Sequence, residues 1–260
     1  YLTRDRYGIK PIYYYFFNGL FLFASETKSI VSHPAFNKEL NLEGVAEYFT
    51  FQNLFSDNTL FKNIKILEAG KFKIIDINAN TIKTFQYWDF CFTENKNLNK
   101  KDCIEELDNR IKKSINRNLI SDVEIGSYLS GGLDSGSITS LISRNHSYLK
   151  TFTCGFDLHS ASGIELNFDE RELAEFMSYK FKTEHYEVIL KSGDMERIME
   201  KIVTHVEEPR VGQCYPNFYI SNLASKFVKV VMSGTGGDEL FAGYPWRYYH
   251  GAYSNNFEEF

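Results

Sequence analysis

The sequence predicts an α/β protein with a doubly wound, mostly parallel sheet, preceded by a smaller α+β part dominated by antiparallel sheet. Three observations lead to this fold class. Strand and helix patterns alternate from residue 104 onward, the first third holds two strand pairs around turn-forming residues, and a polar stretch over 93–101 separates these regions. A chain of 260 residues is long enough for two ordinary cores.

The first region is typical of antiparallel sheet with one helix. The β-rich runs 12–17 and 20–24 flank Asn18-Gly19, the pair best suited to the positive φ values of a two-residue hairpin turn. A second strand pair, 71–77 and 81–85, flanks a turn at 78–80. Between these pairs, apolar residues recur at helical spacing over 42–49.

The second region alternates helices and strands, which predicts a largely parallel sheet. The predicted helices are 104–115, 138–143, 169–181, 195–206 and 217–227, and the predicted strands are 124–129, 151–156, 184–190 and 228–232. The polar stretch over 93–101 is the linker, so we expect one domain over 1–92 and a second over 102–260.

Composition and charge narrow the classes of function. A net charge of −5 gives no global basic field for nucleic acid, and the chain lacks the long apolar run that a membrane span needs. The four cysteines stand far apart and the six histidines lack ligand spacing, so we expect reduced, structural thiols and no transition metal. Nucleic acid and membranes are not expected as partners.

The hexapeptide SGGLDS, residues 130–135, follows a predicted strand and precedes a predicted helix. Its glycines let the backbone approach a ligand, and its serines and the N–H groups of the helix can bind an anion. Asp134 would repel phosphate unless a divalent cation lay between them, which points to Mg²⁺. The alternative is a plain glycine-rich turn, and the lysine of a Walker A motif is missing.

A second glycine-rich loop, SGTGGDE at residues 233–239, follows the apolar strand predicted at 228–232. Because parallel strands place their carboxyl ends at one edge, the two loops can face each other. One loop would hold a triphosphate and the other would complete the metal site through Asp238. The alternative is a structural turn in which Asp238 and Glu239 only favour the first turn of a helix.

These motifs resemble those of a known family. SGGLDS is similar to the pyrophosphate loop of the ATP pyrophosphatases, and SGTGGDELFAGY, residues 233–244, resembles the glutamine-dependent asparagine synthetases within that group. Upstream, RDRYGIKP at 4–11 and FASETK at 23–28 resemble the end of their class II glutamine amidotransferase domain. The resemblance implies the end of an Ntn-type glutaminase domain over 1–92 and a truncated, adenine nucleotide alpha hydrolase-like domain over 102–260.

The resemblance also assigns roles to individual residues. It implies that Leu129 and Cys154 contact the adenosine end of ATP and that Asp134 and Asp238 hold Mg²⁺. Thr235 occupies the position where the family usually carries a Glu that could accept or donate a proton. Cys154 either forms a small apolar wall of the ATP site or only packs in the core. The implied ATP-binding set is Leu129, Ser130, Gly131, Gly132, Asp134, Ser135, Cys154, Ser233 and Gly234, and the catalytic set is Asp134, Asp238 and Thr235.

By resemblance, the activity is glutamine-hydrolysing asparagine synthesis by a C–N ligase. ATP would adenylate the side-chain carboxylate of aspartate to β-aspartyl-AMP, and glutamine-derived ammonia would displace AMP to give asparagine, with pyrophosphate as the other product. The cofactors would be ATP and Mg²⁺, and the partners small molecules: aspartate or a related acid, ATP and ammonia. Thr235 keeps open a paralogue that amidates another acid, such as a cell-surface sugar acid.

Two further alternatives come from other classes of protein. One is a nucleotide-binding module without turnover, against which the intact Ser130, Asp134, Ser135 and Asp238 argue. The other is a tRNA-modifying pyrophosphatase, which the acidic balance disfavours. The resemblance implies a cytoplasmic enzyme and leaves a homodimer open.

The ends of the sequence lead to an expectation about completeness. The chain opens on Tyr1 without a signal-peptide pattern and stops at Phe260 without a helix-stop or turn signal. We expect both ends to be cut. By resemblance, the amidotransferase nucleophile would precede Tyr1 and a phosphate-binding lysine would follow Phe260, so this fragment should not hydrolyse glutamine.

Overall fold

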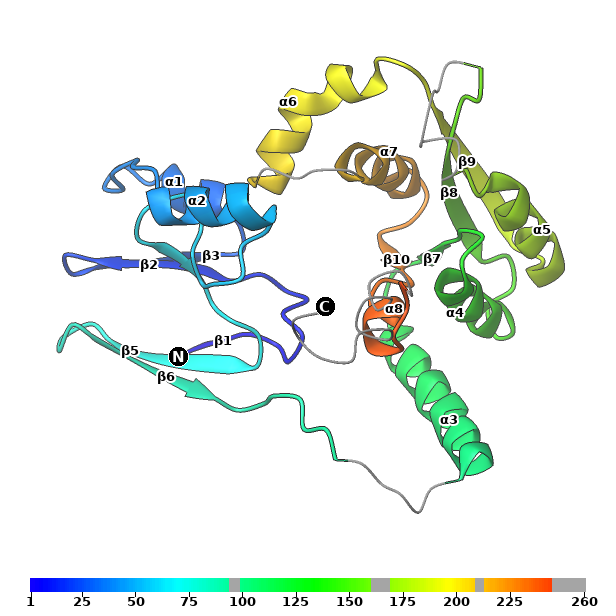
Figure 1. Ribbon diagram of the computed structural model, residues 1–260, viewed down its shortest axis with the longest axis horizontal. Helices are drawn as coiled ribbons and strands as arrows, with labels where there is room; N and C mark the ends of the chain where they lie inside the picture. The colour runs from blue at the N-terminus through cyan, green and yellow to red at the C-terminus, as the bar shows by residue number, and fades with distance from the viewer. Residues whose placement is uncertain (94–98, 160–168, 209–212, 245–260) are drawn as a thin grey trace, which may run out of the picture. The chain divides into compact units, whose positions relative to one another are not determined.

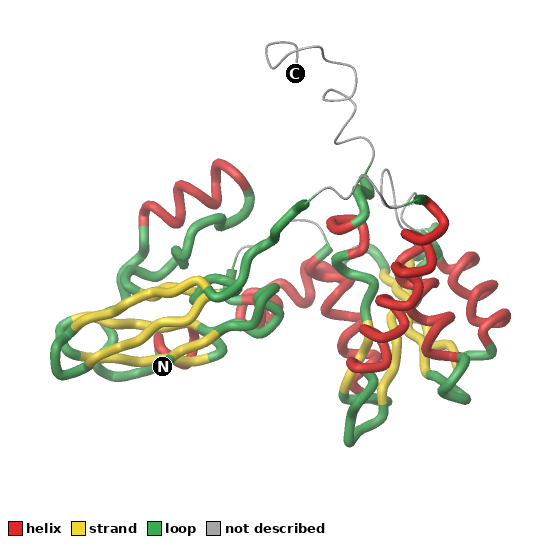
Figure 2. The backbone as a smooth tube through the Cα atoms, turned by 90° about the horizontal axis from the view of Figure 1, so that it is seen from below, coloured by secondary structure: helices red, strands yellow, loops and turns green. Residues whose placement is uncertain are grey.

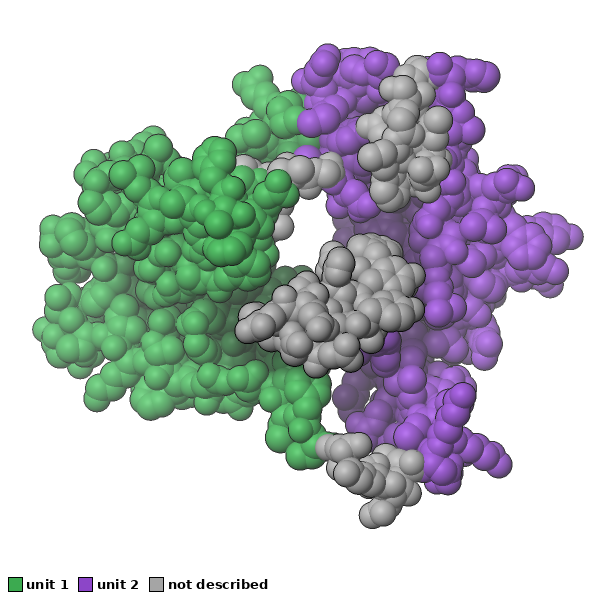
Figure 3. All heavy atoms as spheres, viewed as in Figure 1, with its two compact units in different colours: residues 1–96, 199–212 green, residues 97–198, 213–260 purple. Residues whose placement is uncertain are grey.

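The computed structural model describes residues 1–93, 99–159, 169–208 and 213–244 (Figure 1). The chain divides into two units, coloured separately in Figure 3. Unit 1 comprises Tyr1–Lys96 and Met199–Gly212, and unit 2 comprises Asn97–Ile198 and Gln213–Phe260. Within the described ranges, no helix has the length and apolar character that crossing a bilayer requires.

The first sheet of unit 1 contains the predicted hairpin. β2 (Tyr13–Phe17) and β3 (Leu20–Ala24) pair antiparallel across a two-residue turn, in which Asn18 and Gly19 have φ values of 50° and 76°. These positive angles are those that the Asn-Gly pair predicts. β4 (Ile64–Ile66) pairs with the other edge of β2 and completes a three-stranded antiparallel sheet.

The second sheet of unit 1 contains the other predicted strand pair. β5 (Lys71–Asp76) and β6 (Thr81–Gln86) form an antiparallel hairpin, and β1 (Leu2–Thr3) pairs with the free edge of β5. Figure 2 shows these strands as yellow tubes in unit 1. The sequence predicted the hairpin but not the two-residue β1.

Tyr14 and Tyr15 of β2 pack in two different hydrophobic cores, because successive side chains point to opposite faces of a strand. Tyr14 packs with Leu2 and Leu67 and with apolar side chains of both sheets, so the two sheets pack face to face. Tyr15 points the other way and packs with Ile30 of α1 (Thr27–Val31), among other apolar residues. Unit 1 therefore stacks a helix layer on two antiparallel sheets.

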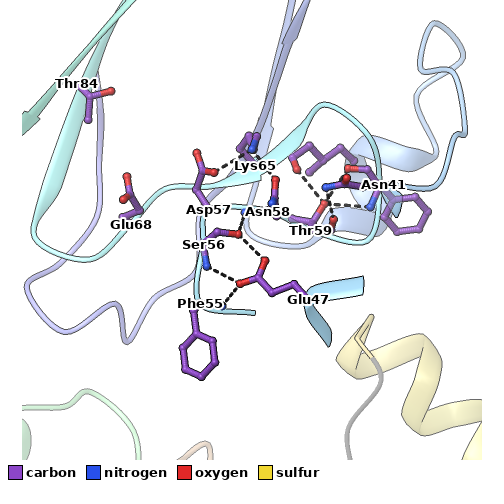
Figure 4. Close-up of polar contacts among 12 residues, drawn as sticks. Asn41, Glu47, Phe55, Ser56, Asp57, Asn58, Thr59, Lys65, Glu68 and Thr84 are labelled. Carbon is purple, nitrogen blue, oxygen red and sulfur yellow. Dashed lines mark hydrogen bonds and ion pairs between the residues drawn. The ribbon is translucent and has the colours of Figure 1, made fainter. Parts of the chain in front are cut away.

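α2 (Leu42–Phe51) is followed by a loop that polar contacts hold in place (Figure 4). The Glu47 carboxylate accepts hydrogen bonds from the backbone N–H groups of Phe55 and Ser56, at 2.6 and 2.9 Å, and from the Ser56 hydroxyl at 2.7 Å. These bonds, the one from the Ser56 hydroxyl foremost, lower the pKa of Glu47. Further along the loop, the Asp57 carboxylate accepts a hydrogen bond from the Lys65 ammonium of β4 at 2.9 Å.

Unit 2 is built on a four-stranded parallel sheet, as the alternating pattern predicts. Its strands are β7 (Ile125–Tyr128), β8 (Lys150–Phe156), β9 (Glu184–Leu190) and β10 (Val230–Met232), in the order β10-β7-β8-β9. The chain runs outward from β7 to β9 and then returns to place β10 on the other side of β7. The strand order thus reverses between β7 and β10, which is where open α/β sheets bind ligands.

Helices cover both faces of this sheet (Figure 1). Apolar residues of α3 and α4 pack around Ile115 and Ile142 on one face, and α7 packs around Phe152 and Ala224 on the other. The remaining helices of the second region are α5, α6 and the short α8. The bounds are α3 Lys100–Asn118, α4 Leu133–Ser143, α5 Arg171–Phe181, α6 Asp194–Val206, α7 Cys214–Ser225 and α8 Gly237–Leu240.

Several predicted boundaries differ from the structure, among them the start of α4, which lies at Leu133 and not at 138; three of the differences have local reasons. α3 begins inside the predicted linker because the Asn99 side chain caps it by accepting the N–H of Asp102 at 2.9 Å. α7 begins three residues early, with Pro216 in its first turn, where a proline is tolerated. β10 begins at Val230 because the N–H of Val228 still bonds the Ala224 carbonyl at 2.9 Å.

Candidate nucleotide-binding site

The SGGLDS loop connects β7 to α4 and is held by its own serines. The hydroxyls of Ser130 and Ser135 lie 2.7 Å apart, the Ser130 N–H donates to the Ser135 hydroxyl at 3.1 Å, and the Gly132 N–H donates to the Ser130 hydroxyl at 3.1 Å. Gly132 is the N-cap of α4. The first N–H groups of a helix have no intrahelical acceptor, so this end of α4 offers donors for an anion.

The SGTGGDE loop connects β10 to α8 in a similar way. The hydroxyls of Ser233 and Thr235 lie 2.7 Å apart, and the Thr235 N–H donates to the Ser233 hydroxyl at 3.2 Å. Gly236 has a φ of 102°, a conformation that glycine adopts far more readily than other residues. α8 then begins at Gly237 and carries Asp238 in its first turn.

The two loops touch each other, because β7 and β10 are neighbours in the sheet. A Cβ atom on Gly234 would lie only 2.7 Å from the backbone nitrogen of Ser135 and 2.9 Å from the Cβ of Asp134. A Cβ atom on Gly237 would overlap the Asp134 carboxylate. The Asp134 carboxylate therefore lies against the start of α8, next to the residue that carries the second carboxylate.

Asp238 lies on the neighbouring residue of α8, and its carboxylate abuts Gly243, where a Cβ atom would overlap it. The Gly243 N–H donates to the Asp238 carbonyl at 2.8 Å, which folds the following chain back onto α8. Ser233, Gly234 and Thr235 thus join the residues of the first loop at one edge of the sheet. Both predicted metal ligands are on these two contacting loops.

The two residues predicted at the adenosine end lie in β8 and beside it. Leu129 is buried, its N–H donates to the Phe152 carbonyl at 3.0 Å, and its carbonyl accepts the Thr153 hydroxyl. Cys154 is half-buried in β8. Burial, assisted by the nearby Asp169 carboxylate, raises the pKa of the Cys154 thiol to about 12. The thiol therefore stays protonated at neutral pH, which disfavours a role as a nucleophile.

The sequence pattern did not single out the start of α5, which packs directly on the SGGLDS loop. A Cβ atom on Gly131 would lie 2.8 Å from the Leu173 side chain and 3.3 Å from the Cβ of Glu170. Arg171 lies over Gly155 and donates to the Phe156 carbonyl at 2.9 Å. The one available signal was Gly155, since a glycine inside a strand often marks a close approach of other chain.

Comparisons with known proteins identify the family of this chain. A model of the asparagine synthase family matches residues 106–260, which is more than half of the chain. The chain belongs to the asparagine synthase family. A glutamine amidotransferase domain model matches residues 1–88.

Curated members of the asparagine synthase family are similar over almost the whole chain. It is 34% identical over 247 residues to a putative glutamine-hydrolysing asparagine synthetase 2 of Methanocaldococcus jannaschii, covering 93% of this chain and 46% of that protein. It is 34% identical over 248 residues to the glutamine-hydrolysing asparagine synthetase 1 of Bacillus subtilis, covering 94% of this chain and 37% of that protein. The chain spans less than half the length of these relatives.

A solved structure also matches part of this asparagine synthase family chain. The NH3-dependent NAD synthetase of Campylobacter jejuni covers 56% of this chain, and the match covers 61% of that protein, at 16% identity and a TM-score of 0.33. A similarity this low carries no argument about fold or function. The domain ranges 1–92 and 102–260 and the individual site roles remain predictions, and the stretch from Ser254 to Phe260 lies outside the described residues.

Proposed function

We propose that the protein is a glutamine-dependent asparagine synthetase, a C–N ligase, and that the loops after β7 and β10 bind its ATP. The contact of Gly234 and Gly237 with Asp134, in a chain of the asparagine synthase family, carries this proposal. We further propose that unit 2 has the adenine nucleotide alpha hydrolase-like fold of an ATP pyrophosphatase, that unit 1 is the end of an Ntn-type glutaminase domain, and that the reaction takes place in the cytoplasm.

The adenylation step needs charge stabilisation at the triphosphate. A side-chain oxygen of aspartate attacks the α-phosphorus of ATP, and the bond from this phosphorus to the bridging oxygen breaks, releasing pyrophosphate. In this proposal the N–H groups at the start of α4 bind the pyrophosphate oxygens, while the Ser130–Ser135 hydroxyl pair holds the loop in shape. Leu129 and Cys154 would line the adenosine end.

The described residues suit a magnesium ion that is shared with a nucleotide. Asp134 and Asp238 offer carboxylate oxygens, the ligands that Mg²⁺ prefers, and no group of three or more His, Cys, Asp or Glu converges in the described ranges. Mg²⁺ typically uses one or two carboxylates together with substrate phosphates, so this donor set fits. When bound, the ion would neutralise charge on the phosphate oxygens.

The amidation step completes the balance of atoms. The nitrogen of ammonia attacks the acyl carbon of β-aspartyl-AMP, the bond to the AMP oxygen breaks, and a proton leaves the new nitrogen to give the amide. Thr235 has no carboxylate to accept that proton, and its hydroxyl is paired with Ser233. A paralogue that amidates another acid is therefore the second candidate.

The test uses the full-length protein with ATP, Mg²⁺, ammonia and a panel of acids: aspartate, glutamate and a uronic acid. We expect AMP and pyrophosphate to form in equal amounts with aspartate and asparagine to accumulate. Asp238→Asn should lower this rate by about 100-fold or more, because a group that stabilises charge in the transition state is lost. Glu239→Gln, which neutralises an exposed carboxylate on the same helix, is the matched control.

Other outcomes would contradict the proposed substrate, the proposed turnover or the role of Asp238. AMP formation with the uronic acid and not with aspartate would replace the proposal by the sugar-acid paralogue. ATP binding without AMP formation for any acid would identify a non-catalytic nucleotide-binding module. A wild-type rate in Asp238→Asn would remove Asp238 from the site.

A further inference from the structure

The Glu207 carboxylate is bound by the backbone at the start of α1. Its two oxygens accept the N–H groups of Thr27 at 2.8 Å and of Lys28 at 2.6 Å. These are the first residues of the helix, and the N-cap Glu26 supplies no side-chain bond to them. Because the first N–H groups of a helix lack intrahelical acceptors, Glu207 satisfies donors that would otherwise need water.

The Glu207 side chain is shielded from solvent and has a cation beside it. Its side chain is only 10% exposed, and Thr27 is 4% exposed. The Lys28 ammonium lies 3.8 Å from the Glu207 carboxylate and donates to the Thr204 carbonyl at 3.4 Å. Two backbone bonds and a nearby cation therefore hold a largely buried carboxylate, although Glu207 is 180 positions away from Thr27 in the sequence.

The backbone at Glu207 adopts an unusual conformation. Its φ is 61°, in the left-handed region that glycine favours, and its N–H bonds the Val203 carbonyl at 2.9 Å, so it ends α6 as a left-handed C-terminal cap. A glycine or asparagine is usual at such a position. A glutamate here is explained by the carboxylate that this conformation directs to α1.

The contact joins residues that are matched by two different family models. Thr27 and Lys28 lie in the range matched by the glutamine amidotransferase model, and Glu207 lies in the range matched by the asparagine synthase model. Nevertheless, residues 199–212 group with residues 1–96 in unit 1. The contact therefore fastens a piece of the synthetase sequence into the unit that holds the amidotransferase sequence.

We propose that Glu207 is a positioning residue that couples glutamine hydrolysis to amide formation by holding segment 199–207 to α1. The inference rests on the proposed function, in which ammonia is released by one family region and consumed by the other. Segment 199–207 precedes α7 of unit 2 in the sequence. When the segment is detached from α1, ammonia is lost to solvent more often than it is captured, while the adenylation site keeps its residues.

The test compares Glu207→Gly with the unmodified full-length protein. Glycine suits the positive φ of this position, so the variant removes the carboxylate without straining the end of α6. Two rates are measured with glutamine, glutamate release and asparagine formation, and asparagine formation is measured again with ammonia. We expect the ratio of glutamate to asparagine to rise at least about 3-fold, with the ammonia-dependent rate unchanged.

Two further variants are needed: one weakens the same contact and the other is a control. Thr27→Pro deletes one of the two donors, and a proline is tolerated at the first position of a helix after the extended Glu26, so an intermediate ratio is expected. Glu200→Ala removes an exposed carboxylate from α6 and should leave the ratio at the wild-type value. Amide hydrogen exchange of Thr27 and Lys28 reports whether the contact itself is lost.

The outcomes separate this inference from the proposed function. Faster exchange at Thr27 and Lys28 with an unchanged ratio would overturn the coupling role, and so would equal losses of the glutamine- and ammonia-dependent rates. If the unmodified protein forms no asparagine from ammonia and aspartate, the proposed function itself fails, and the inference fails with it. A raised ratio in Glu207→Gly, with the ammonia-dependent rate kept, supports both.

Discussion

Two glycines determine how closely the SGGLDS and SGTGGDE loops approach each other. Gly234 contacts the backbone at Ser135, and Gly237 contacts the Asp134 carboxylate, so neither position has room for a Cβ atom. This requirement differs from that of Gly236, whose positive φ is the reason for glycine there. The close approach is what places Asp134 at the start of α8.

Gly237→Ala should therefore act on the ligand rather than on the fold. The added Cβ overlaps the Asp134 carboxylate, which is half-exposed and can turn away. We therefore expect the affinity for ATP in the presence of Mg²⁺ to fall by about 10-fold or more. The free energy of unfolding should fall by only about 1–2 kcal/mol. Isothermal titration calorimetry and urea unfolding measure the two effects. Leu240→Ala, at an exposed side chain of the same helix, should keep wild-type affinity; equal affinities in both variants would contradict the placement of Asp134.

Single residues differ in how far the sequence alone could place them. Cys154 was predicted to be either a wall of the ATP site or core packing; the raised pKa of its thiol disfavours a nucleophile and does not distinguish these two roles. Lys73 was not foreseen. It lies 6% exposed between the sheets, where burial lowers its pKa and it donates to Thr84 at 2.9 Å. An isolated lysine in a strand pattern gives no sign that a facing hydroxyl will satisfy it.

At the scale of elements, an ion pair holds the start of α5 beside the SGGLDS loop. Arg171 donates to Asp169 at 2.7 Å, and the N–H groups of Phe156 and Arg171 also donate to this carboxylate at 3.1 Å each. Burial alone would raise the pKa of Asp169, but these bonds outweigh it and lower the pKa below its ordinary value. The charged form of Asp169 is therefore favoured by folding.

Asp169→Asn should lower the free energy of unfolding by about 1–3 kcal/mol at pH 7, because Arg171 loses its ionised partner. Since the folded-state pKa lies below the unfolded value of about 3.9, the stabilisation is complete above pH 4–5 and disappears as the pH falls through the folded-state pKa. Urea unfolding of both proteins between pH 7 and pH 2 measures this dependence.

The matched control for this prediction is Asp108→Asn, which breaks an exposed ion pair with Lys112 on α3. It should change stability by no more than about 0.5 kcal/mol. A difference between wild type and Asp169→Asn that persists unchanged at pH 2 would show that the carboxylate charge is not what stabilises the start of α5.

Elements with local signals were predicted well, and those that depend on distant pairing were not. The hairpin of β2 and β3 follows from Asn18-Gly19, which sets its turn directly. β1 and β4 have two and three residues, too few for any periodicity, and they are strands only because Lys73 and Tyr15 lie opposite them in other strands. Likewise, α1 is too short to show a helical repeat.

At the scale of the whole molecule, the chain passes between the two units three times. It leaves unit 1 after Lys96, returns at Met199 and leaves again after Gly212. The sequence suggested only the first passage, because the polar stretch over 93–101 has a linker composition. Met199 lies inside the helical pattern predicted over 195–206, so nothing local marked the second passage.

Cutting the first connection should therefore leave the two pieces associated. With a protease site introduced at residues 94–98, we expect the cleaved pieces to co-elute in native gel filtration, because residues 199–207 remain bound to α1 through contacts such as that of Glu207. The pieces should separate in denaturant. Separate elution under native conditions would show that segment 199–212 contributes little to unit 1.

The two glycine-rich loops could be located from the sequence, whereas the part of the fold that packs on them could not, and the roles of their residues remain predictions. Both glycine-rich loops, with Asp134 and Asp238, could be recognised because their residues are contiguous and follow strands. The contact of Leu173 with Gly131 could not, because it depends on how α5 lies on the sheet. Contiguous motifs can be read from sequence, whereas a wall supplied by a packed helix needs coordinates.

The position of β10 also bears on how the protein is made. Strands β7 to β9 are complete once Leu190 has been synthesised, but β10 starts only at Val230, and at 5–20 residues per second the ribosome needs roughly 2–8 s for this interval. During that time the strand that pairs with this edge of β7 has not yet been made. A polypeptide stalled in this interval would carry the SGGLDS loop but not the SGTGGDE loop, so the proposed nucleotide site would be assembled only late in translation, when the final strand pairs with β7.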